Sequence, residues 1–256
     1  MHAEIVNALD DAERSRVAIP PLTETHPQLT LSDAYTVQAG WLARKLAAGG
    51  ELAGRKVGLT SQAMQKQLNV HEPDFGFLLR SMLVASGGTL QRAELVRPRV
   101  EPEIGFWLSS DLHGPGVTVE QVLRATRGVC AALEIVDSRI ADWRIKLVDT
   151  VADNGSSARA VLSDQVVAVD DLELVKEQVT LVRNGEPVGS GDGAAVLGHP
   201  AEAVAWLANT LAGFDQSLMA GQVVLPGAMC ASVFAEAGET FEARFTHLGT
   251  VSIRFA

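Results

Sequence analysis

Two glutamates stand one residue apart in a segment typical of a β-strand. They are Glu101 and Glu103, within residues 97–108, RPRVEPEIGFWL. Side chains of a strand alternate between its two faces, so residues i and i+2 point the same way. The pattern predicts two carboxylates side by side, next to the apolar residues of the same segment. Such charges repel each other, and burying them unpaired is costly, so the pair needs a compensating feature.

Three arrangements would relieve the repulsion. The carboxylates could face water, pair with Arg97 and Arg99 on the same face of the strand, or bind a cation together. A third carboxylate, Glu134, favours the cation, because it lies within the apolar run GVCAALEIV. Hard divalent cations such as Mg²⁺ prefer a few oxygen ligands and keep positions open for water or substrate. The spacing of the glutamates alone does not decide among the three arrangements.

Further polar residues lie in unusual surroundings. Lys56, between glycines and apolar residues in AGRKVGLT, is either an exposed lysine or a pocket lysine that binds a carboxylate or moves a proton. Asp74, in EPDFG, is either a turn residue or a site residue. Ser156 belongs to the polar stretch 148–159, VDTVADNGSSAR. Turn chemistry and helix capping would explain that stretch, and so would the wall of a small-molecule pocket.

The elements that must position these residues are mainly helices in the first third of the chain. We expect a helix over 2–17 and a second helix from Asp33 to Ala48, capped by Ser32 and ended by Gly49-Gly50. Residues 61–68 predict a short helix.

Later segments predict strands with inserted helices. Residues 81–112 alternate apolar segments with turn residues, which indicates β structure. Residues 118–133 predict a helix that runs into a strand over 134–140. Asn184-Gly185 predicts a hairpin turn, and His199-Pro200 a helix start. The chain closes with strands within 221–230, 239–249 and 251–256.

Composition restricts the class of protein. The chain has 256 residues, of which 47% are hydrophobic, and a net charge of −10. The acidic balance disfavours nucleic acid and anionic membranes as partners. No apolar run reaches the roughly 18 residues that span a bilayer, and the N-terminus lacks a signal-peptide core, so we expect a cytoplasmic protein. Cys130 and Cys230 are expected to be buried thiols, without a disulfide or a zinc site.

The fold class expected from this pattern is α+β. We divide the chain into a helical N-terminal region, residues 1–78, and a β-rich catalytic domain, residues 79–256.

Several segments, in order from about residue 18 to the C-terminus, resemble one enzyme family. They are GRKVGLTSQAMQKQLNVHEPDFGFL, RPRVEPEIGFWL, HGPGVT, ALEIVDSRIADWRIKLVDTVADNGSS, LGHPAEAVAWLANTLA and GTVSIRFA. The chain resembles the 2-hydroxypenta-2,4-dienoate hydratases (2-keto-4-pentenoate or vinylpyruvate hydratases) of the fumarylacetoacetate hydrolase superfamily. The resemblance implies a mixed β-roll or sandwich after the helical part. It also implies water addition to a 2-hydroxydienoate in aromatic or steroid meta-cleavage catabolism, and a homo-oligomer.

The resemblance also assigns roles to the six residues singled out above. It makes Glu101, Glu103 and Glu134 the ligands of Mg²⁺ or Mn²⁺. It places the family's lysine, loop aspartate and serine on Lys56, Asp74 and Ser156, which are the candidate catalytic residues.

The chain departs from the family at two places. Gly155 stands where the family usually has alanine, and Leu225-Pro226-Gly227-Ala228 stands where many members read TGA. The second change loses a threonine hydroxyl and, at Pro226, a backbone N–H, so the preference for substrate side chains can differ.

Other functions remain open. The first is a 4-oxalocrotonate-type decarboxylase, which has the same metal site but needs a pocket for a second carboxylate. The second is a non-catalytic metal-binding subunit that partners a pathway decarboxylase or aldolase. Hydrolysis ranks below these, because the sequence offers no clear counterpart of the superfamily's His-Glu lid pair.

Overall fold

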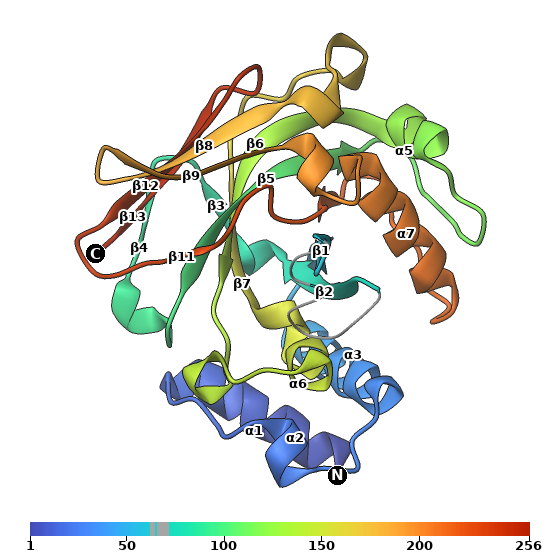
Figure 1. Ribbon diagram of the computed structural model, residues 1–256. Helices are drawn as coiled ribbons and strands as arrows, with labels where there is room; N and C mark the ends of the chain where they lie inside the picture. Colours follow the sequence, from blue (N-terminus) through green and yellow to red (C-terminus); the bar gives the residue numbers. More distant parts are fainter. Residues whose placement is uncertain (62–64, 66–71) are drawn as a thin grey trace.

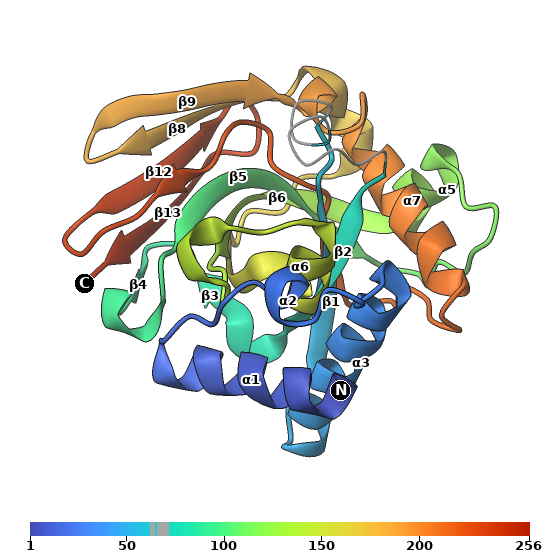
Figure 2. The ribbon, with the colours of Figure 1, turned by 60° about the horizontal axis from the view of Figure 1, so that its bottom comes forward.

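The helical part of the chain lies at one end of the structure, a computed structural model that describes residues 1–61, 65 and 72–256 (Figure 1). The predicted helix over 61–68 falls mostly outside the described residues. The α-helices are α1 (His2–Ser15), α2 (Leu22–Thr25), α3 (Leu31–Ala47), α5 (Val119–Ala125), α6 (Leu147–Ala152) and α7 (Pro200–Ala212). Helices α1, α2, α3 and α6 gather at this end, and α5 and α7 lie together elsewhere (Figures 1 and 2).

The second helix begins earlier than predicted. Helix α3 starts at Leu31 with Thr30 as its N-cap, so the predicted cap at Ser32 was wrong. The Asp33 backbone N–H donates to Thr30 Oγ1 over 3.2 Å, and Asp33 Oδ2 accepts from the Thr30 backbone N–H over 3.0 Å. This reciprocal pair of hydrogen bonds satisfies two backbone donors that a start at Ser32 would leave unpaired.

Two β-sheets make up most of the described chain. The larger sheet has strands β1 (Leu52–Gly58), β2 (Asp74–Leu79), β3 (Leu83–Ala85), β5 (Arg99–Leu108), β6 (Thr126–Val136), β7 (Ser157–Leu162), β10 (Val223–Leu225) and β11 (Val233–Phe234). The smaller sheet has β4 (Gly88–Leu90), β8 (Gln178–Arg183), β9 (Glu186–Asp192), β12 (Thr240–Phe245) and β13 (Thr250–Phe255). Short 3₁₀ turns are η1 (Arg80–Met82), η2 (Arg92–Glu94), η3 (Ala141–Trp143), η4 (Asn154–Ser156), η5 (Val169–Asp171), η6 (Leu174–Lys176) and η7 (Gly193–Ala195).

The strand order is mixed. The larger sheet runs β2-β1-β10-β5-β6-β7-β3 with β11 beside β5, and the smaller sheet runs β4-β13-β12-β8-β9. Strands β1 and β10 are parallel, whereas β5 and β6 are antiparallel over nearly their whole length. Residues of both sheets share one buried hydrophobic cluster, which includes Ile104 and Phe106 of the larger sheet and Phe241 and Phe255 of the smaller. This confirms the α+β class with a mixed sheet arrangement.

Strand β6 replaces most of a predicted helix. Helix α5 ends at Ala125, and β6 begins at Thr126, so the prediction of a helix over 118–133 was wrong beyond its first turns. Apart from the exposed Arg127, every residue of β6 is buried. Strands β5 and β7 cover its two edges, so a continuous apolar run suits it, and such a run cannot be told from a buried helix by its periodicity.

The predicted hairpin and the last helix are confirmed. Asn184 and Gly185 have positive φ of 52° and 89°, and they connect β8 to β9. His199 caps α7, accepting the Ala201 backbone N–H at Nδ1 over 3.0 Å, and Pro200 is the first helical residue. None of the described helices is long and apolar enough to cross a membrane.

Candidate metal centre and neighbouring polar groups

Strands β5 and β6 bring the three predicted carboxylates together. Glu101 and Glu134 are Cα partners across the antiparallel ladder, and Glu103 lies two residue pairs further along β5. One carboxylate oxygen of each residue lies within 4.8 Å of those of the other two. Glu103 and Glu134 are fully buried, and Glu101 is half-buried. The sequence prediction that they form one cluster is confirmed.

The two fully buried carboxylates of the cluster have oxygens that lack hydrogen-bond partners in the described chain. Glu103 Oε1 and both oxygens of Glu134 have no hydrogen-bond partner among the described residues. Burial and the neighbouring Glu134 together raise the pKa of Glu101 to about 7, although Lys56 and Arg99 oppose the rise. Burial, Glu134 and Glu101 together hold the pKa of Glu103 well above its ordinary value. A divalent cation would satisfy these oxygens and offset the repulsion, so the donor set fits Mg²⁺ or Mn²⁺.

Salt bridges to the neighbouring arginines do not account for the cluster. No ion pair within 4.0 Å joins Arg97 or Arg99 to Glu101 or Glu103 in the described part of the chain. Arg97 is exposed, and its guanidinium stacks on the ring of Phe234 at 4.6 Å.

A backbone N–H holds the Glu103 carboxylate in place. The Gly227 N–H donates to Glu103 Oε2 over 2.7 Å. Gly227 has a φ of +123°, and a Cβ there would lie 2.0 Å from Thr60 Oγ1. Only glycine fits this conformation and this close approach. In the sequence Gly227 stands out only as part of the segment LPGA, and nothing in its spacing indicates a contact with Glu103.

Lys56 faces the carboxylates from strand β1. It is 4% exposed, so the reading of an exposed lysine was wrong. Its Nζ lies 3.4 Å from Glu134 Oε2 and donates to the Gly155 carbonyl over 3.1 Å. Burial alone would lower the pKa of Lys56, but the surrounding carboxylates, Glu134 foremost, raise it above its ordinary value. The side chain is therefore a charged lysine inside the site.

Asp74 lies beside Lys56 at the start of strand β2. Gly58 is its Cα partner on β1, and a Cβ at Gly58 would lie 2.1 Å from Asp74 Oδ1. Burial raises the pKa of Asp74, while Lys56, the Gly58 N–H and the Thr150 hydroxyl oppose that rise. Asp74 is thus a buried carboxyl next to an ammonium, and no pattern in the sequence indicates that Gly58 and Thr150 lie beside it.

Ser156 is held by a buried polar network behind the site. Its hydroxyl lies 3.4 Å from Asp153 Oδ2, and Asp153 forms a short ion pair with Arg139. Arg139 Nη1 also donates to the carbonyls of Asp137 and Ser157 over 2.7 and 3.0 Å. Both explanations offered for this polar stretch therefore apply: it caps local backbone, and it forms one wall of a cavity.

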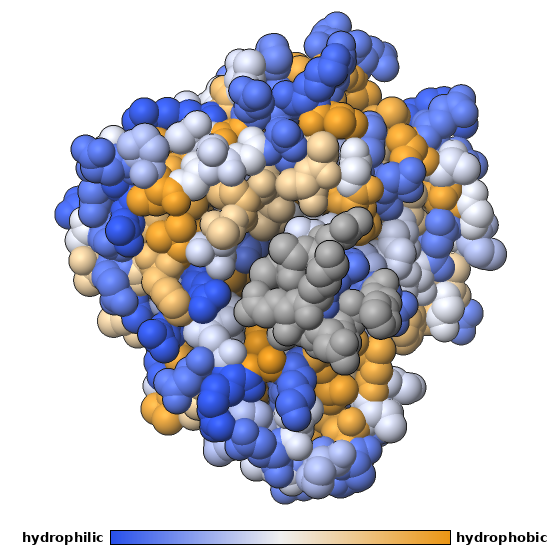
Figure 3. Space-filling model, in the orientation of Figure 1, coloured by the Kyte–Doolittle hydropathy of each residue, from blue (hydrophilic) through white to orange (hydrophobic). Residues whose placement is uncertain are grey.

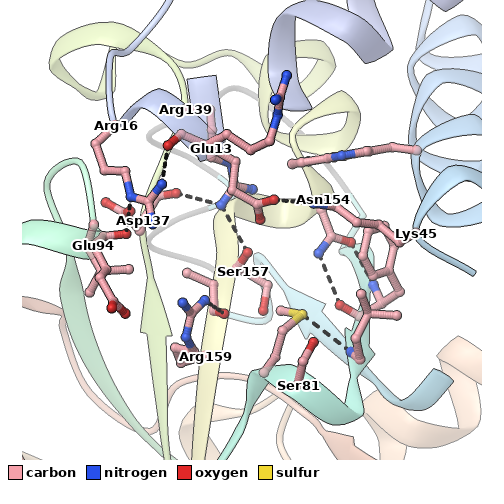
Figure 4. A pocket seen from close by; sticks show the side chains of 17 residues that line it. Glu13, Arg16, Lys45, Ser81, Glu94, Asp137, Arg139, Asn154, Ser157 and Arg159 are labelled. Carbon is pink, nitrogen blue, oxygen red and sulfur yellow. Dashed lines mark hydrogen bonds and ion pairs between the residues drawn. The ribbon is translucent and has the colours of Figure 1, made fainter. Parts of the chain in front are cut away.

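Asn154 connects that network to strand β2. Its side-chain amide donates to the Phe77 carbonyl over 3.0 Å and accepts the Phe77 N–H over 2.7 Å. Arg139, Asn154 and Ser157 line a cavity of about 260 Å³ that α1 also borders (Figure 4). The three glutamates do not line that cavity, so it is separate from the candidate metal centre.

Two cavities meet at Glu101. One, of about 80 Å³, is lined by Lys56, Asp74 and Ser156 among others. The other, of about 410 Å³, is lined by Arg99 and by residues 57–61 and 228–232. Glu101 borders both, so this glutamate of the cluster faces a cavity on two sides. Cys230 lines the larger cavity and is only half-buried, which corrects the expectation of a buried thiol, whereas Cys130 is buried as expected.

Comparison with known proteins gives consistent matches over nearly the whole chain. Residues 46–256 match the family described as fumarylacetoacetate (FAA) hydrolase C-terminal. The chain is 48% identical to the 2-hydroxyhexa-2,4-dienoate hydratase of Comamonas testosteroni, covering 96% of this chain and 94% of the relative. It is 43% identical to a 2-keto-4-pentenoate hydratase of Paraburkholderia xenovorans (strain LB400), covering 98% and 94%.

A solved structure matches throughout. It is the 4-oxalocrotonate decarboxylase of Pseudomonas putida G7, complexed with magnesium and adipate. The sequence identity is 35% and the TM-score 0.97, and the match covers 100% of this chain and 97% of that one.

Proposed function

The chain belongs to the fumarylacetoacetate hydrolase family, and on that premise we propose that it is a metal-dependent 2-hydroxydienoate hydratase. It adds water to 2-hydroxypenta-2,4-dienoate, or to a homologue substituted at carbon 5, and gives a 4-hydroxy-2-oxoalkanoate. This is a hydro-lyase reaction of meta-cleavage catabolism. Hydratases that are 48% and 43% identical over nearly the full chain support the assignment.

One observation carries the proposal: three carboxylates cluster beside a buried lysine and a buried aspartate, and the two fully buried ones, Glu103 and Glu134, have oxygens without a hydrogen-bond partner in the described part of the chain. Such a cluster is costly unless a cation holds it together. We assign Glu101, Glu103 and Glu134 as ligands of Mg²⁺ or Mn²⁺. The relative of known structure that carries magnesium supports this cofactor.

The reaction needs proton transfers at two carbons. The dienol must take a proton at carbon 5 and lose the proton of its carbon-2 hydroxyl to become an unsaturated ketone. Water must then add its hydroxyl at carbon 4 and a proton at carbon 3. A divalent cation at the three glutamates would stabilise negative charge on the oxygen at carbon 2. Every proton transfer still requires a positioned acid or base, which contributes roughly 10²–10⁴-fold in rate.

The surroundings of Asp74 suit proton transfer, and those of Lys56 suit binding of an anionic substrate. Burial raises the pKa of Asp74, which favours a carboxyl able to give and take a proton. The carboxylates keep Lys56 charged, which favours binding of an anionic substrate oxygen. We propose Asp74 as the proton-transfer group, Lys56 as the cation that holds the substrate, and Ser156 as the group that orients substrate or water.

Decarboxylation of a 2-oxo-dienedioate is the alternative. It would use the same carboxylates, and the likeness to the P. putida decarboxylase favours it. The two reactions give different products, since only decarboxylation releases CO₂. Incubating the Mg²⁺-loaded protein with freshly generated 2-hydroxypenta-2,4-dienoate and recording NMR spectra tests the hydratase directly. Appearance of 4-hydroxy-2-oxopentanoate is expected; unchanged diene alongside CO₂ release from 4-oxalocrotonate would assign the chain to the decarboxylases.

We further propose that the enzyme is a cytoplasmic homo-oligomer. Large hydrophobic side chains such as Phe214 and Met219 are more than 40% exposed, and hydrophobic atoms form several groups on the face seen in Figure 3. A complex with a pathway decarboxylase or aldolase would use such surfaces too. Sedimentation should give a mass well above the 27.2 kDa of one chain, and a monomer at micromolar concentration would contradict the proposal.

A further inference from the structure

Arg99 occupies an unusual position next to the candidate metal centre. It is the first residue of β5 and shares the odd-numbered face of that strand with Glu101 and Glu103. Its Cα is two residues, roughly 6.8 Å, from that of Glu101. It lines the cavity of about 410 Å³ that Glu101 also borders.

Two aromatic rings fix the orientation of the Arg99 guanidinium. Its central carbon lies 4.1 Å from the centre of the Phe234 ring and 4.5 Å from that of Trp143. The Trp143 indole is itself anchored, since its Nε1 donates to the Arg97 carbonyl over 3.0 Å. Arginine stacked in this way keeps its in-plane N–H groups free for an acceptor.

Those N–H groups are largely unused. Arg99 Nε is buried without a partner, and Ser232 Oγ, 3.4 Å from Nη1, is the one acceptor that the described residues offer the side chain. No described carboxylate lies within 4.0 Å of it, and residues 62–64 and 66–71 contain no aspartate or glutamate. Its nearest acid, Glu101, would be engaged by a cation. A planar, oriented guanidinium without its own counter-ion matches the geometry of a carboxylate.

We propose that Arg99 binds a carboxylate of the substrate in the larger cavity, next to the cation-binding glutamates. The inference rests on the hydratase function proposed above and deepens it, because it names the group that recognises the substrate's negative charge. Lys56 would act on the substrate from the smaller cavity, where Glu134 and the Gly155 carbonyl contact its ammonium. It does not line the larger cavity, so a carboxylate there falls to Arg99. The carboxylate is either the one at carbon 1 or a distal one on a dicarboxylic substrate, and the experiment below distinguishes the two.

The test is direct binding of two unreactive 2-oxo acids to the Mg²⁺-loaded protein. 2-Oxopentanoate and 2-oxoglutarate have the same chain length and the same head group, and only the second has a distal carboxylate. Dissociation constants come from calorimetry. Because Trp143 stacks on Arg99, its fluorescence gives a second readout, and Trp143→Phe should remove that signal.

The variants compare Arg99→Met with Arg97→Met. Arg97 stacks on the same Phe234 ring but does not line the cavity, so it is a matched control. Losing a charged hydrogen-bond partner should weaken binding at least about tenfold in Arg99→Met, and Arg97→Met should bind as the wild type does. Arg99→Lys, which keeps the charge but not the paired geometry, should bind with intermediate affinity.

The pattern of losses identifies the carboxylate. Equal weakening of both acids places the carbon-1 carboxylate on Arg99, and weakening of 2-oxoglutarate alone places the distal one there. Unchanged affinity for both acids in Arg99→Met and Arg99→Lys, or no change in Trp143 fluorescence when the wild type binds them, would overturn the proposal. Turnover of 2-hydroxypenta-2,4-dienoate by the wild type is measured separately, so failure of the hydratase function is recognised independently.

Discussion

Glu101 and Glu134 are direct partners across two antiparallel strands, so two carboxylates face each other inside the protein. Like charges in such positions destabilise a sheet. Glu103 adds a third like charge, so the cluster depends on the Lys56 ammonium and on a cation to offset the repulsion. The candidate metal centre is therefore a site of charge repulsion in the fold that cation binding would relieve.

Removing one carboxylate should abolish metal binding. Glu134→Gln should weaken Mn²⁺ binding by more than the roughly 10–100-fold typical of losing a group that merely supports a ligand. Electron paramagnetic resonance of Mn²⁺ measures this affinity. Glu120→Gln, at an exposed position on α5, is the control and should bind Mn²⁺ as the wild type does. Equal affinities in the two variants would remove Glu134 from the site.

Metal binding should depend on pH around neutrality. The pKa of Glu101 is about 7 without metal, against an ordinary 4.5. A carboxyl with a raised folded-state pKa favours folding below pH 4.5, and that contribution disappears as pH rises through about 7. The metal-free protein should therefore lose thermal stability between pH 5 and about pH 8. Mg²⁺ binds the ionised form, so the increase in melting temperature on adding Mg²⁺ should grow over the same range; a pH-independent increase would contradict this.

Lys56 should matter for turnover but not for metal binding. Lys56→Ala should reduce kcat/KM at least about 10²-fold, the lower end for a positioned catalytic group, while binding Mn²⁺ at least as tightly as the wild type. Lys56→Arg keeps the charge and cannot release a proton at neutral pH. Substantial rescue by arginine would support a role in holding the substrate, and activity as low as that of alanine a role in proton transfer. Wild-type turnover in Lys56→Ala would exclude Lys56 from the site.

Gly58→Ala should disable the site by steric conflict. The new Cβ would lie 2.1 Å from Asp74 Oδ1 and 3.1 Å from Lys56 Nζ, so both side chains must move. We expect kcat to fall by about 10²-fold or more, because misplacing catalytic groups by about 1 Å costs that much. Gly40→Ala in α3 is the control, since its Cβ would meet only Val6 Cγ2 at 3.4 Å. Equal activity in both variants would show that Asp74 and Lys56 need not keep these positions.

A charged partner for Arg55 should stabilise the protein. Arg55 is 4% exposed, and its Nη2 donates to the uncharged Gln216 Oε1 over 2.5 Å. Burial lowers the pKa of Arg55 to about 10, and no carboxylate opposes that shift. Gln216→Glu should raise the free energy of unfolding by about 1 kcal/mol, because charge-assisted hydrogen bonds are stronger. Urea denaturation measures this, and Gln216→Met, which leaves the guanidinium unpaired, should be less stable than the wild type.

The sequence predicts the parts of the site whose residue types are unusual for their surroundings. Glu101, Glu103 and Glu134 stand out because carboxylates are rare in apolar strands, and alternation places the first two on one face. The sequence does not predict the parts of the site that depend on backbone groups. Gly227 reaches Glu103 through an N–H, and Gly58 matters because it has no Cβ. Such roles depend on a partner far along the chain, which no local pattern records.

The same limit explains the errors in the fold. The run from Thr126 to Leu133 is apolar at every position but two, so its periodicity does not separate a helix from a strand. Pairing with β5, which comes earlier in the chain, and with β7, which comes later, makes this run a strand. The α3 start was predicted two residues late because Ser32 and Thr30 are both good caps, and only the reciprocal bond to Asp33 selects Thr30.

The parallel pairing of β1 with β10 has a consequence for how the protein is made. Lys56 lies on β1, whereas the neighbouring strand β10 and the Gly227 N–H that holds Glu103 come more than 160 residues later. During synthesis, the three glutamates emerge from the ribosome well before that support exists. A nascent chain is therefore left with an edge of the sheet uncovered beside clustered charges until β10 and Gly227 have been translated. The candidate metal centre should form only after that point, and chains stalled before β10 should neither retain Mn²⁺ nor resist proteolysis.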